Sequence, residues 1–271
     1  MVGVMSIQAA SSISVHGHRG ARAVRPENTL PAFEYAIQAG VDVLELDVAV
    51  TKDNVLVVSH DPRMNSHYCT APAGWLGTNV IREMTLAELR RWDCGAKVNP
   101  QFPRQVAMPG TRVPTLDEVY ALSPRGKFEF NVETKIFAKH PELTPAPGEF
   151  ARLMVEAIRR HKLEKRVIVQ SFDFRTLKAV KALAPEIRLS ALFEARGMRD
   201  VVKATVEAGA TICSPHYTLV NASLVERAHA AGLQVVPWTA NEPEQWEKLV
   251  EAKVDAIISD DPAALLAYLK R

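Results

Sequence analysis

Short apolar segments alternate along this chain with longer segments in which apolar side chains recur every three or four positions. The short segments are rich in β-branched residues and are typical of buried strands; they cover residues 13–18, 43–48, 128–133, 167–171, 189–193, 211–214, 234–238 and 256–259. Between them, Phe150, Leu153, Met154, Ala157 and Ile158 follow the period of an amphipathic helix. A strand followed by a helix, many times over, predicts a parallel sheet.

A small repeat supports this prediction. Ala39-Gly40, Ala208-Gly209 and Ala231-Gly232 each stand between a helical segment and the next strand, where glycine readily ends a helix in the left-handed conformation. Eight candidate strands fit a (β/α)₈ barrel, the TIM-barrel architecture, better than an open doubly wound sheet, although periodicity alone does not separate the two. A chain of 271 residues suits one such domain.

One stretch departs from the alternation. Residues 55–59 read as an extra strand after the second barrel strand, and residues 61–114 then carry many proline and glycine breakers. Long irregular segments in compact domains usually serve function. We therefore expect a single domain over residues 1–271, with residues 61–114 as a capping insertion.

Charge and composition exclude several classes of protein. The 33 basic and 31 acidic residues form no basic run, which argues against a nucleic-acid partner. Residues 1–14 contain no Lys or Arg, unlike a signal peptide, and no apolar run is long enough for a membrane span. Three cysteines, Cys69, Cys94 and Cys213, have no metal-ligand spacing, so we expect reduced thiols and a cytoplasmic protein, with a Cys69–Cys94 bridge as the minor alternative.

Carboxylates gather at the ends of two predicted strands. Glu45 and Asp47 stand at i and i+2, so their side chains point to the same face, with Cα atoms about 7 Å apart. Glu133 ends the next barrel strand, and Lys135 follows it in the same alternation. Oxygen ligands favour Mg²⁺ or Ca²⁺ over zinc. Taken alone, Glu-x-Asp is more often an acidic pair neutralised by arginines.

Histidines and cations follow the same strand ends. His18 and His60 titrate near neutral pH and could exchange protons with a substrate. Arg19 could bind a phosphate through two hydrogen bonds, and Lys135 could neutralise charge on its oxygens. Three carboxylates, these two cations, a divalent ion and a phosphodiester together carry no net charge, as a desolvated site requires. Either histidine alone would more simply be a satisfied loop residue.

These motifs resemble the signature of the glycerophosphodiester phosphodiesterases. The resemblance rests on HRGARAVRPENTLPAFEYAIQAGVDVLELDVAVTKDNVLVVSHDP and continues through NVETK, QSFD, WTAN and SDDP. It implies a TIM barrel with a cap at residues 61–114, one divalent cation, and hydrolysis of small glycerophosphodiesters to sn-glycerol 3-phosphate and an alcohol. It also implies that the ring of Trp238 lies against the glycerol moiety.

Other matching positions suggest supporting roles. Glu27, Asn28 and Thr29 begin a helix, with Asn28 or Thr29 as its cap, while Glu27 could equally brace Arg19 or the metal ligands. Gln170 ends a strand and could supply a polar contact. The segment from Ser259 to Pro262 most simply caps the last helix.

Alternative functions remain open at this point. A lysophospholipase D or sphingomyelinase-like phosphodiesterase would use the same residues, with an apolar groove built from Met64, Tyr68, Trp75, Leu76 and Val80. An enolate-forming barrel lyase fits the two histidines and Arg19 less well. A non-catalytic phosphodiester-binding module would be expected to lose His18 or His60. The residues do not tell whether water or the neighbouring glycerol hydroxyl attacks the phosphorus.

Overall fold

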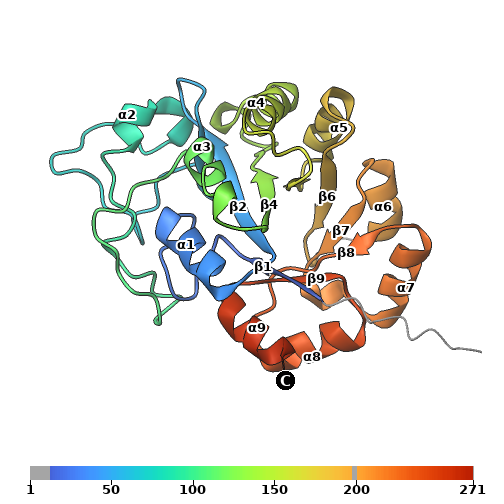
Figure 1. Ribbon diagram of the computed structural model, residues 1–271. Helices are drawn as coiled ribbons and strands as arrows, with labels where there is room; N and C mark the ends of the chain where they lie inside the picture. Colours follow the sequence, from blue (N-terminus) through green and yellow to red (C-terminus); the bar gives the residue numbers. More distant parts are fainter. Residues whose placement is uncertain (1–12, 197–199, 271) are drawn as a thin grey trace, which may run out of the picture.

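Eight parallel strands form a nearly closed barrel in the part of the chain that the computed structural model describes, residues 13–196 and 200–270 (Figure 1). Their order around the barrel is β8-β7-β6-β5-β4-β2-β1-β9. The strands are β1 (Ser14–Gly17), β2 (Val43–Val50), β4 (Glu129–Thr134), β5 (Val167–Ser171), β6 (Arg188–Phe193), β7 (Ile212–Pro215), β8 (Gln234–Val235) and β9 (Ala256–Ser259). A further strand, β3 (Leu56–Val58), pairs antiparallel with β2. The predicted (β/α)₈ barrel is confirmed.

The barrel closes between β8 and β9 without a regular ladder. The N–H groups of Asp255 and Ile258 donate to the carbonyl oxygens of Val235 and Pro237, both at 3.0 Å. The strand predicted at residues 234–238 is regular only at Gln234–Val235, while Trp238 still forms an isolated parallel bridge with His216. Pro237 has no N–H group, so a regular ladder cannot continue through it.

Helices surround the sheet and follow the strands in chain order (Figure 1). The longer ones are α1 (Leu30–Ala39), α4 (Pro147–Arg160), α5 (Phe174–Leu183), α6 (Val201–Glu207), α7 (Ala222–Ala230), α8 (Pro243–Glu251) and α9 (Pro262–Leu269). Shorter helical segments are η1 (Ile81–Glu83), α2 (Leu86–Leu89), α3 (Leu116–Tyr120), η2 (Ser123–Arg125), η3 (Pro141–Leu143) and η4 (Tyr217–Leu219). The three predicted Ala-Gly helix ends are confirmed, because Gly40, Gly209 and Gly232 all have positive φ.

Apolar side chains fill two layers. Ile168, Ile212, Val236, Ala256 and Ile258 meet inside the barrel, and a larger cluster fills the space between the strands and the surrounding helices. Helix α1 shows how the sequence fixes these contacts: Thr29 caps its start, and Phe33 and Ala36 on its inner face are fully buried. The strand ends are thereby held in fixed positions around the barrel mouth.

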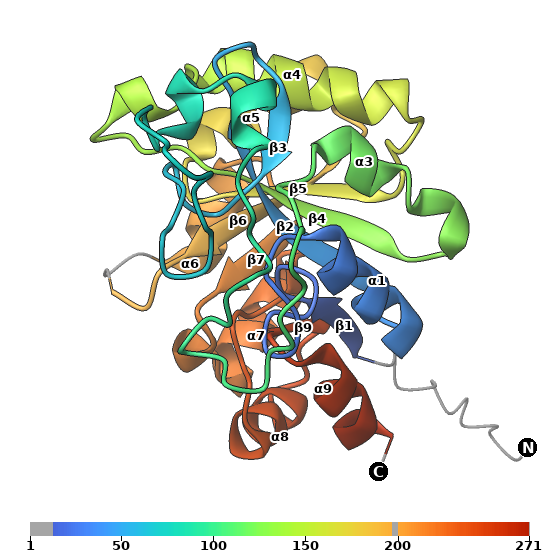
Figure 2. The ribbon, with the colours of Figure 1, turned by 90° about the vertical axis from the view of Figure 1, so that its left-hand side faces the viewer.

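Residues 61–114, which we call the excursion, lie beside the barrel on the side of α1 and α3 (Figure 1). They have an apolar cluster of their own, which includes Met64, Ile81, Met84, Leu89 and Trp92. Their last part runs down past α1 towards α8 and α9 (Figure 2). Its backbone bonds there to the loop after β1, where Val106 N donates to Val24 O at 3.1 Å.

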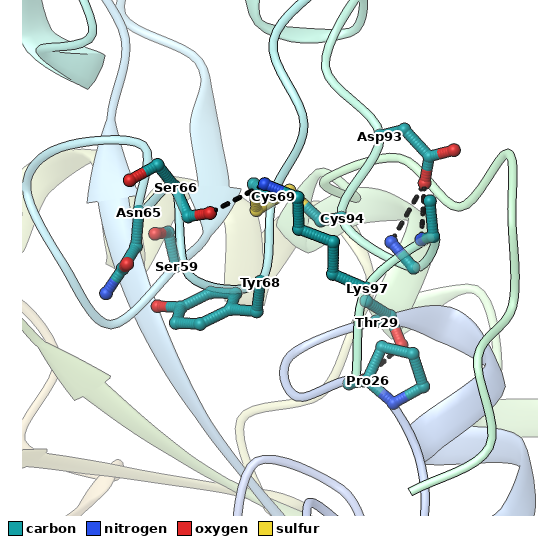
Figure 3. The surroundings of a disulfide bond; sticks show 12 residues. Pro26, Thr29, Ser59, Asn65, Ser66, Tyr68, Cys69, Asp93, Cys94 and Lys97 are labelled. Atoms are coloured by element: carbon teal, nitrogen blue, oxygen red, sulfur yellow. Dashed lines mark hydrogen bonds between the residues drawn. A yellow bond between two sulfur atoms is a disulfide. The ribbon is translucent and has the colours of Figure 1, made fainter. Parts of the chain in front are cut away.

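A disulfide joins Cys69 to Cys94 within the excursion (Figure 3). The expected reduced state of these two cysteines is therefore wrong. The reason is an antiparallel bridge between the neighbouring residues Thr70 and Asp93, which sets the two sulfur atoms opposite each other. Spacing along the sequence does not reveal such a bridge, and a disulfide is typical of oxidising compartments. The cysteines thus lend no support to a cytoplasmic location.

None of the helices in the two described ranges is both long and apolar enough to cross a membrane. The expectation that the first residues are not a signal peptide concerns a segment of which residues 1–12 lie outside the described part of the chain.

Candidate active site

A cavity of about 500 Å³ opens at the carboxyl ends of the barrel strands. Nine of the predicted site residues line it, and they lie on or after the barrel strands β1, β2, β4, β5 and β8 or, for His60, after the hairpin strand β3: His18, Arg19, Glu45, Asp47, His60, Glu133, Lys135, Gln170 and Trp238. Glu27 and Asn28 do not line this cavity. They lie behind it, along a smaller cavity that also touches His60.

Glu45, Asp47 and Glu133 form a buried cluster. Each offers a carboxylate oxygen within 4.8 Å of the others. The register of the parallel strands explains the grouping, since Asp47 on β2 pairs directly with Glu133 on β4. Burial, and then the charge of Asp47, raise the pKa of Glu45 well above its usual value; burial also raises the pKa of Glu133. Such a concentration of buried negative charge is suited to a divalent cation.

Two cations already contact this cluster. Lys135 Nζ lies 2.9 Å from Glu133 Oε1 and 3.4 Å from Asp47 Oδ1, and Arg19 Nε lies 3.1 Å from Asp47 Oδ2. Although burial alone would raise it, Lys135 and Arg19 hold the pKa of Asp47 well below its usual range. The two cations therefore favour the charged form of Asp47 at the cavity wall.

Neutral amides orient the carboxylates from behind. Asn28 Nδ2 donates to Asp47 Oδ2 at 2.9 Å, and Gln170 Nε2 donates to Glu45 Oε1 at 2.6 Å. Gln170 is itself fixed, because its oxygen accepts a bond from Asn131 Nδ2 at 2.9 Å. Of the two predicted helix caps, Thr29 serves α1, so Asn28 is free to contact Asp47.

The turn after β1 brings the backbone into the site. Arg19 has φ 48°, and its N–H donates to Glu45 Oε2 at 2.9 Å. Gly20 follows at φ 84°, where a Cβ atom would lie 2.7 Å from the carbonyl carbon of Ala32. The side chain of Arg19 is braced by Glu27, whose Oε1 accepts from Arg19 Nη1 at 2.7 Å. Of the two predicted roles of Glu27, the structure thus shows contact with Arg19.

His18 belongs to a chain of contacts that we call the barrel arm: His18, Asp260 and Asn241. His18 Nδ1 lies 2.5 Å from Asp260 Oδ1, and Asn241 Nδ2 donates to Asp260 Oδ2 at 2.7 Å. The other imidazole nitrogen, Nε2, lies 3.9 Å from Glu45 Oε2. Burial lowers the pKa of His18, and Asp260 opposes this shift. His18 thus turns Nε2 towards the acidic cluster.

His60 belongs to a similar chain, the excursion arm: His60, Asp61, Asn65 and Tyr68. His60 Nδ1 lies 2.8 Å from Asp61 Oδ1. Asp61 Oδ2 accepts from Asn65 Nδ2 at 2.8 Å and from Tyr68 OH at 3.1 Å. The bond to His60, together with the other donors, lowers the pKa of Asp61. The disulfide lies next to this arm, since Cys69 N donates to Asn65 O at 2.8 Å.

Sequence reasoning missed the carboxylates of both arms. Asp260 was expected only to cap the last helix, but Asp261 does so, accepting from Ala264 N at 3.0 Å. The available signal was the pair of adjacent aspartates, because one cap needs only one of them. Asp61 was visible beside His60, whereas nothing in the sequence joins His18 to Asp260, 242 positions away.

Another part of the cavity wall is apolar. Ile136, Phe137, Phe172, Leu192 and Trp238 line it. The rings of Phe172 and Trp238 meet edge to face, with centroids 5.5 Å apart, and Trp238 Nε1 donates to Ser214 O at 3.0 Å. Trp238 is thus fixed at the cavity wall.

Comparison with known proteins agrees with this site. The profile of the Glycerophosphoryl diester phosphodiesterase family matches residues 18–264. A glycerophosphodiester phosphodiesterase of Caldanaerobacter subterraneus subsp. tengcongensis is 33% identical over 95% of this chain and 98% of its own length. A Silicibacter pomeroyi crystal structure carrying the same family name superposes with a TM-score of 0.89 at 32% identity, covering 96% of this chain and 94% of that one.

A structure of an Oleispira antarctica phosphodiesterase in complex with the product sn-glycerol-3-phosphate is also similar. It has a TM-score of 0.80 and 25% identity, and covers 95% of this chain and 97% of the other. The match of the family profile spans most of the chain, and the fold and the residues at the barrel mouth agree with it. The chain therefore belongs to the glycerophosphoryl diester phosphodiesterase family and is a phosphoric diester hydrolase.

Proposed function

We propose that this enzyme hydrolyses glycerophosphodiesters, such as glycerophosphocholine, to sn-glycerol 3-phosphate and an alcohol. The observation that carries the proposal is the meeting of three buried carboxylates, two cations and two histidines in one cavity of about 500 Å³. This set can bind a phosphodiester, stabilise added negative charge on it and move protons on both sides of the phosphorus.

Glu45, Asp47 and Glu133 would hold one divalent cation, Mg²⁺ or Ca²⁺, because all three ligands are carboxylate oxygens. When bound, such a cation supplies Lewis-acid stabilisation of a phosphate oxygen. Arg19 and Lys135 add positive charge beside the same cluster. Both are positioned to bind the substrate phosphate, and the glycerol or alcohol moiety would then face Trp238.

His18 and His60 would exchange the protons. In each arm a carboxylate accepts from Nδ1, so Nε2 is the nitrogen left to face the substrate. One imidazole takes the proton of the attacking oxygen, which is that of water or of the neighbouring glycerol hydroxyl. The other gives a proton to the departing alkoxide.

Residues 61–114 are proposed to belong to the same domain as the barrel and to act as a cap at its side. Among the residues that line the main cavity, Asp61 is the member of this range. The contribution of the cap would therefore be to hold His60 in place. Of the side chains predicted for an acyl-chain groove, Met64 and Val80 are buried and Trp75 packs on Trp92, whereas Leu76 is 99% exposed. None of these residues, nor Tyr68, lines the main cavity, so they favour no acyl-chain groove beside the catalytic residues.

The test is the release of sn-glycerol 3-phosphate from glycerophosphocholine, with and without a chelator, beside a lysophospholipid. We expect chelator-sensitive release from the small diester. Glu45→Gln should abolish the metal-dependent activity, while the same change at the exposed Glu34 on α1 should leave it unchanged. Turnover of the lysophospholipid alone would move the assignment to acyl-chain substrates. Absence of any turnover would favour a binding module.

A further inference from the structure

Asp260 lies at the end of β9 and contacts His18 from the side away from the acidic cluster. It is buried, and its two carboxylate oxygens have different partners: Oδ1 faces His18 Nδ1 and Oδ2 faces Asn241 Nδ2. Helix capping does not account for this side chain, because Asp261 caps α9. Arg22 Nε lies 3.5 Å from Asp260 Oδ1 and helps to balance its charge.

The orientation of the Asn241 amide is fixed by the backbone. Its Oδ1 accepts from Asp260 N at 2.9 Å and from Ser259 Oγ at 3.3 Å. Because an N–H group can only donate, the oxygen of Asn241 must face it, and the NH₂ group must point to Asp260 Oδ2. Asp260 Oδ2 accepts from Asn241, and Asp260 Oδ1 can also only accept. The hydrogen bond with His18 therefore requires a proton on His18 Nδ1.

We propose that Asp260 and Asn241 are positioning residues that fix the tautomer of His18, with the proton on Nδ1 and the lone pair of Nε2 turned to the substrate. The inference rests on the proposed function for its catalytic consequence. The hydrogen-bond logic itself depends only on the contacts within the barrel arm. Neither residue touches the substrate, since both act through the imidazole.

Asp260→Asn tests this directly, because the new side chain has the same shape. Asn241 cannot turn round, so the new amide at position 260 must present its oxygen to Asn241 and its NH₂ group to His18 Nδ1. That NH₂ group can donate only to an unprotonated Nδ1, so the imidazole proton must move to Nε2. A reversed tautomer cannot accept a proton at Nε2, so we expect kcat to fall at least about 100-fold. KM should change by no more than about threefold, because phosphate binding is untouched.

The matched rescue is the exchange of the two side chains, Asp260→Asn with Asn241→Asp. The new carboxylate at position 241 would accept from the backbone N–H and from the new amide at position 260. The oxygen of that amide would then face His18 again. We expect the kcat of the double variant to be at least about tenfold higher than that of Asp260→Asn. Asp261→Asn is the control for the same chemical change one position along, and it should retain the parent kcat.

A second readout does not require turnover. Nitrogen-15 NMR of the histidine-labelled protein, at a pH where the imidazoles are neutral, should show His18 protonated at Nδ1 in the parent and at Nε2 in Asp260→Asn. An unchanged tautomer, or a kcat within about threefold of the parent, would overturn the proposal. A double variant no better than Asp260→Asn would overturn the role of Asn241. If the parent itself releases no sn-glycerol 3-phosphate, the proposed function fails, while the NMR result still decides the tautomer.

Discussion

The barrel arm and the excursion arm both orient a histidine through a carboxylate, but they are built on different parts of the fold. In both, a histidine Nδ1 meets a carboxylate whose second oxygen accepts from an asparagine amide. The barrel arm is set on strand ends and is nearly enclosed, with the His18 side chain 12% exposed. The excursion arm stands on an irregular segment, and the His60 side chain is 34% exposed.

The two arms are held in place by different kinds of contact. Strand ends are fixed by the ladder, so the barrel arm needs only side-chain bonds. The excursion has few regular elements and relies instead on its own apolar cluster, a disulfide and a tyrosine hydroxyl. We therefore expect the two arms to be equally important for turnover but to respond differently to reduction of the disulfide, to pH and to the loss of single hydrogen bonds.

The largest expected effect is the loss of either histidine. His18→Ala and His60→Ala should each lower kcat about 10²- to 10⁴-fold, because each removes one proton-transfer group. Circular dichroism and gel filtration should show the parent fold in both. Near-normal turnover in either variant would refute the acid-base role of that residue.

Reduction of the disulfide should act on the excursion arm alone. The bridge closes a separation of 25 residues, which corresponds to about 3.5 kcal/mol of stabilisation in the chain-entropy account. We expect a reductant to lower the stability of the excursion and the kcat, because Cys69 bonds to Asn65 beside Asp61.

The control is the Cys69→Ser, Cys94→Ser double variant. It should resemble the reduced parent and show no further response to reductant, while Cys213 is present in both proteins. Thermal unfolding and turnover before and after reduction measure the effect. If the oxidised and the reduced parent have the same kcat, the disulfide does not help to hold the excursion arm in its catalytic position.

The free energy of unfolding should fall below neutral pH because of a buried histidine in the barrel, His16. Burial, with a smaller effect of Arg188, lowers the pKa of His16 on β1 to about 3. In the unfolded chain His16 is protonated below about pH 6.5, whereas in the folded chain it stays neutral down to about pH 3. The free energy of unfolding therefore falls as the pH falls from 6.5 towards 3. Between pH 7 and pH 5 the loss from this group is about 2 kcal/mol.

Urea unfolding of the parent and of His16→Gln at the two pH values measures this loss. The variant should lose less stability over the interval than the parent does. His18 has the same sign of shift, so some dependence should persist in the variant. Equal losses in both proteins would show that His16 is not the source.

The smallest expected effect is that of Tyr68→Phe. It removes one of the bonds to Asp61 and leaves His60 and Asn65 in place. A net hydrogen bond of about 1 kcal/mol corresponds to about a fivefold fall in kcat. Tyr268→Phe, the same change on α9, is the control and should leave kcat unaltered. A fall of more than about 100-fold would mean that Tyr68 has a direct role.

Much of this architecture was predictable from the sequence, because its causes are local. Apolar periodicity located all eight barrel strands, and the alternation at Glu45 and Asp47 placed both carboxylates on one face. Pro237 was also visible and could have shortened the predicted strand. Asp260 and the Cys69–Cys94 bridge could not be predicted in this way. Both depend on contacts that exist only after distant segments have folded together.

The two arms are proposed to carry different proton transfers. A glycerophosphodiester with a p-nitrophenol leaving group needs no proton donor for its departure, so comparing it with glycerophosphocholine separates the acid from the base. Because His18 is proposed to accept the proton, we expect His60→Ala, and not His18→Ala, to regain most of its activity on the activated substrate. If both variants are impaired to the same degree on both substrates, the division of roles between the arms is contradicted.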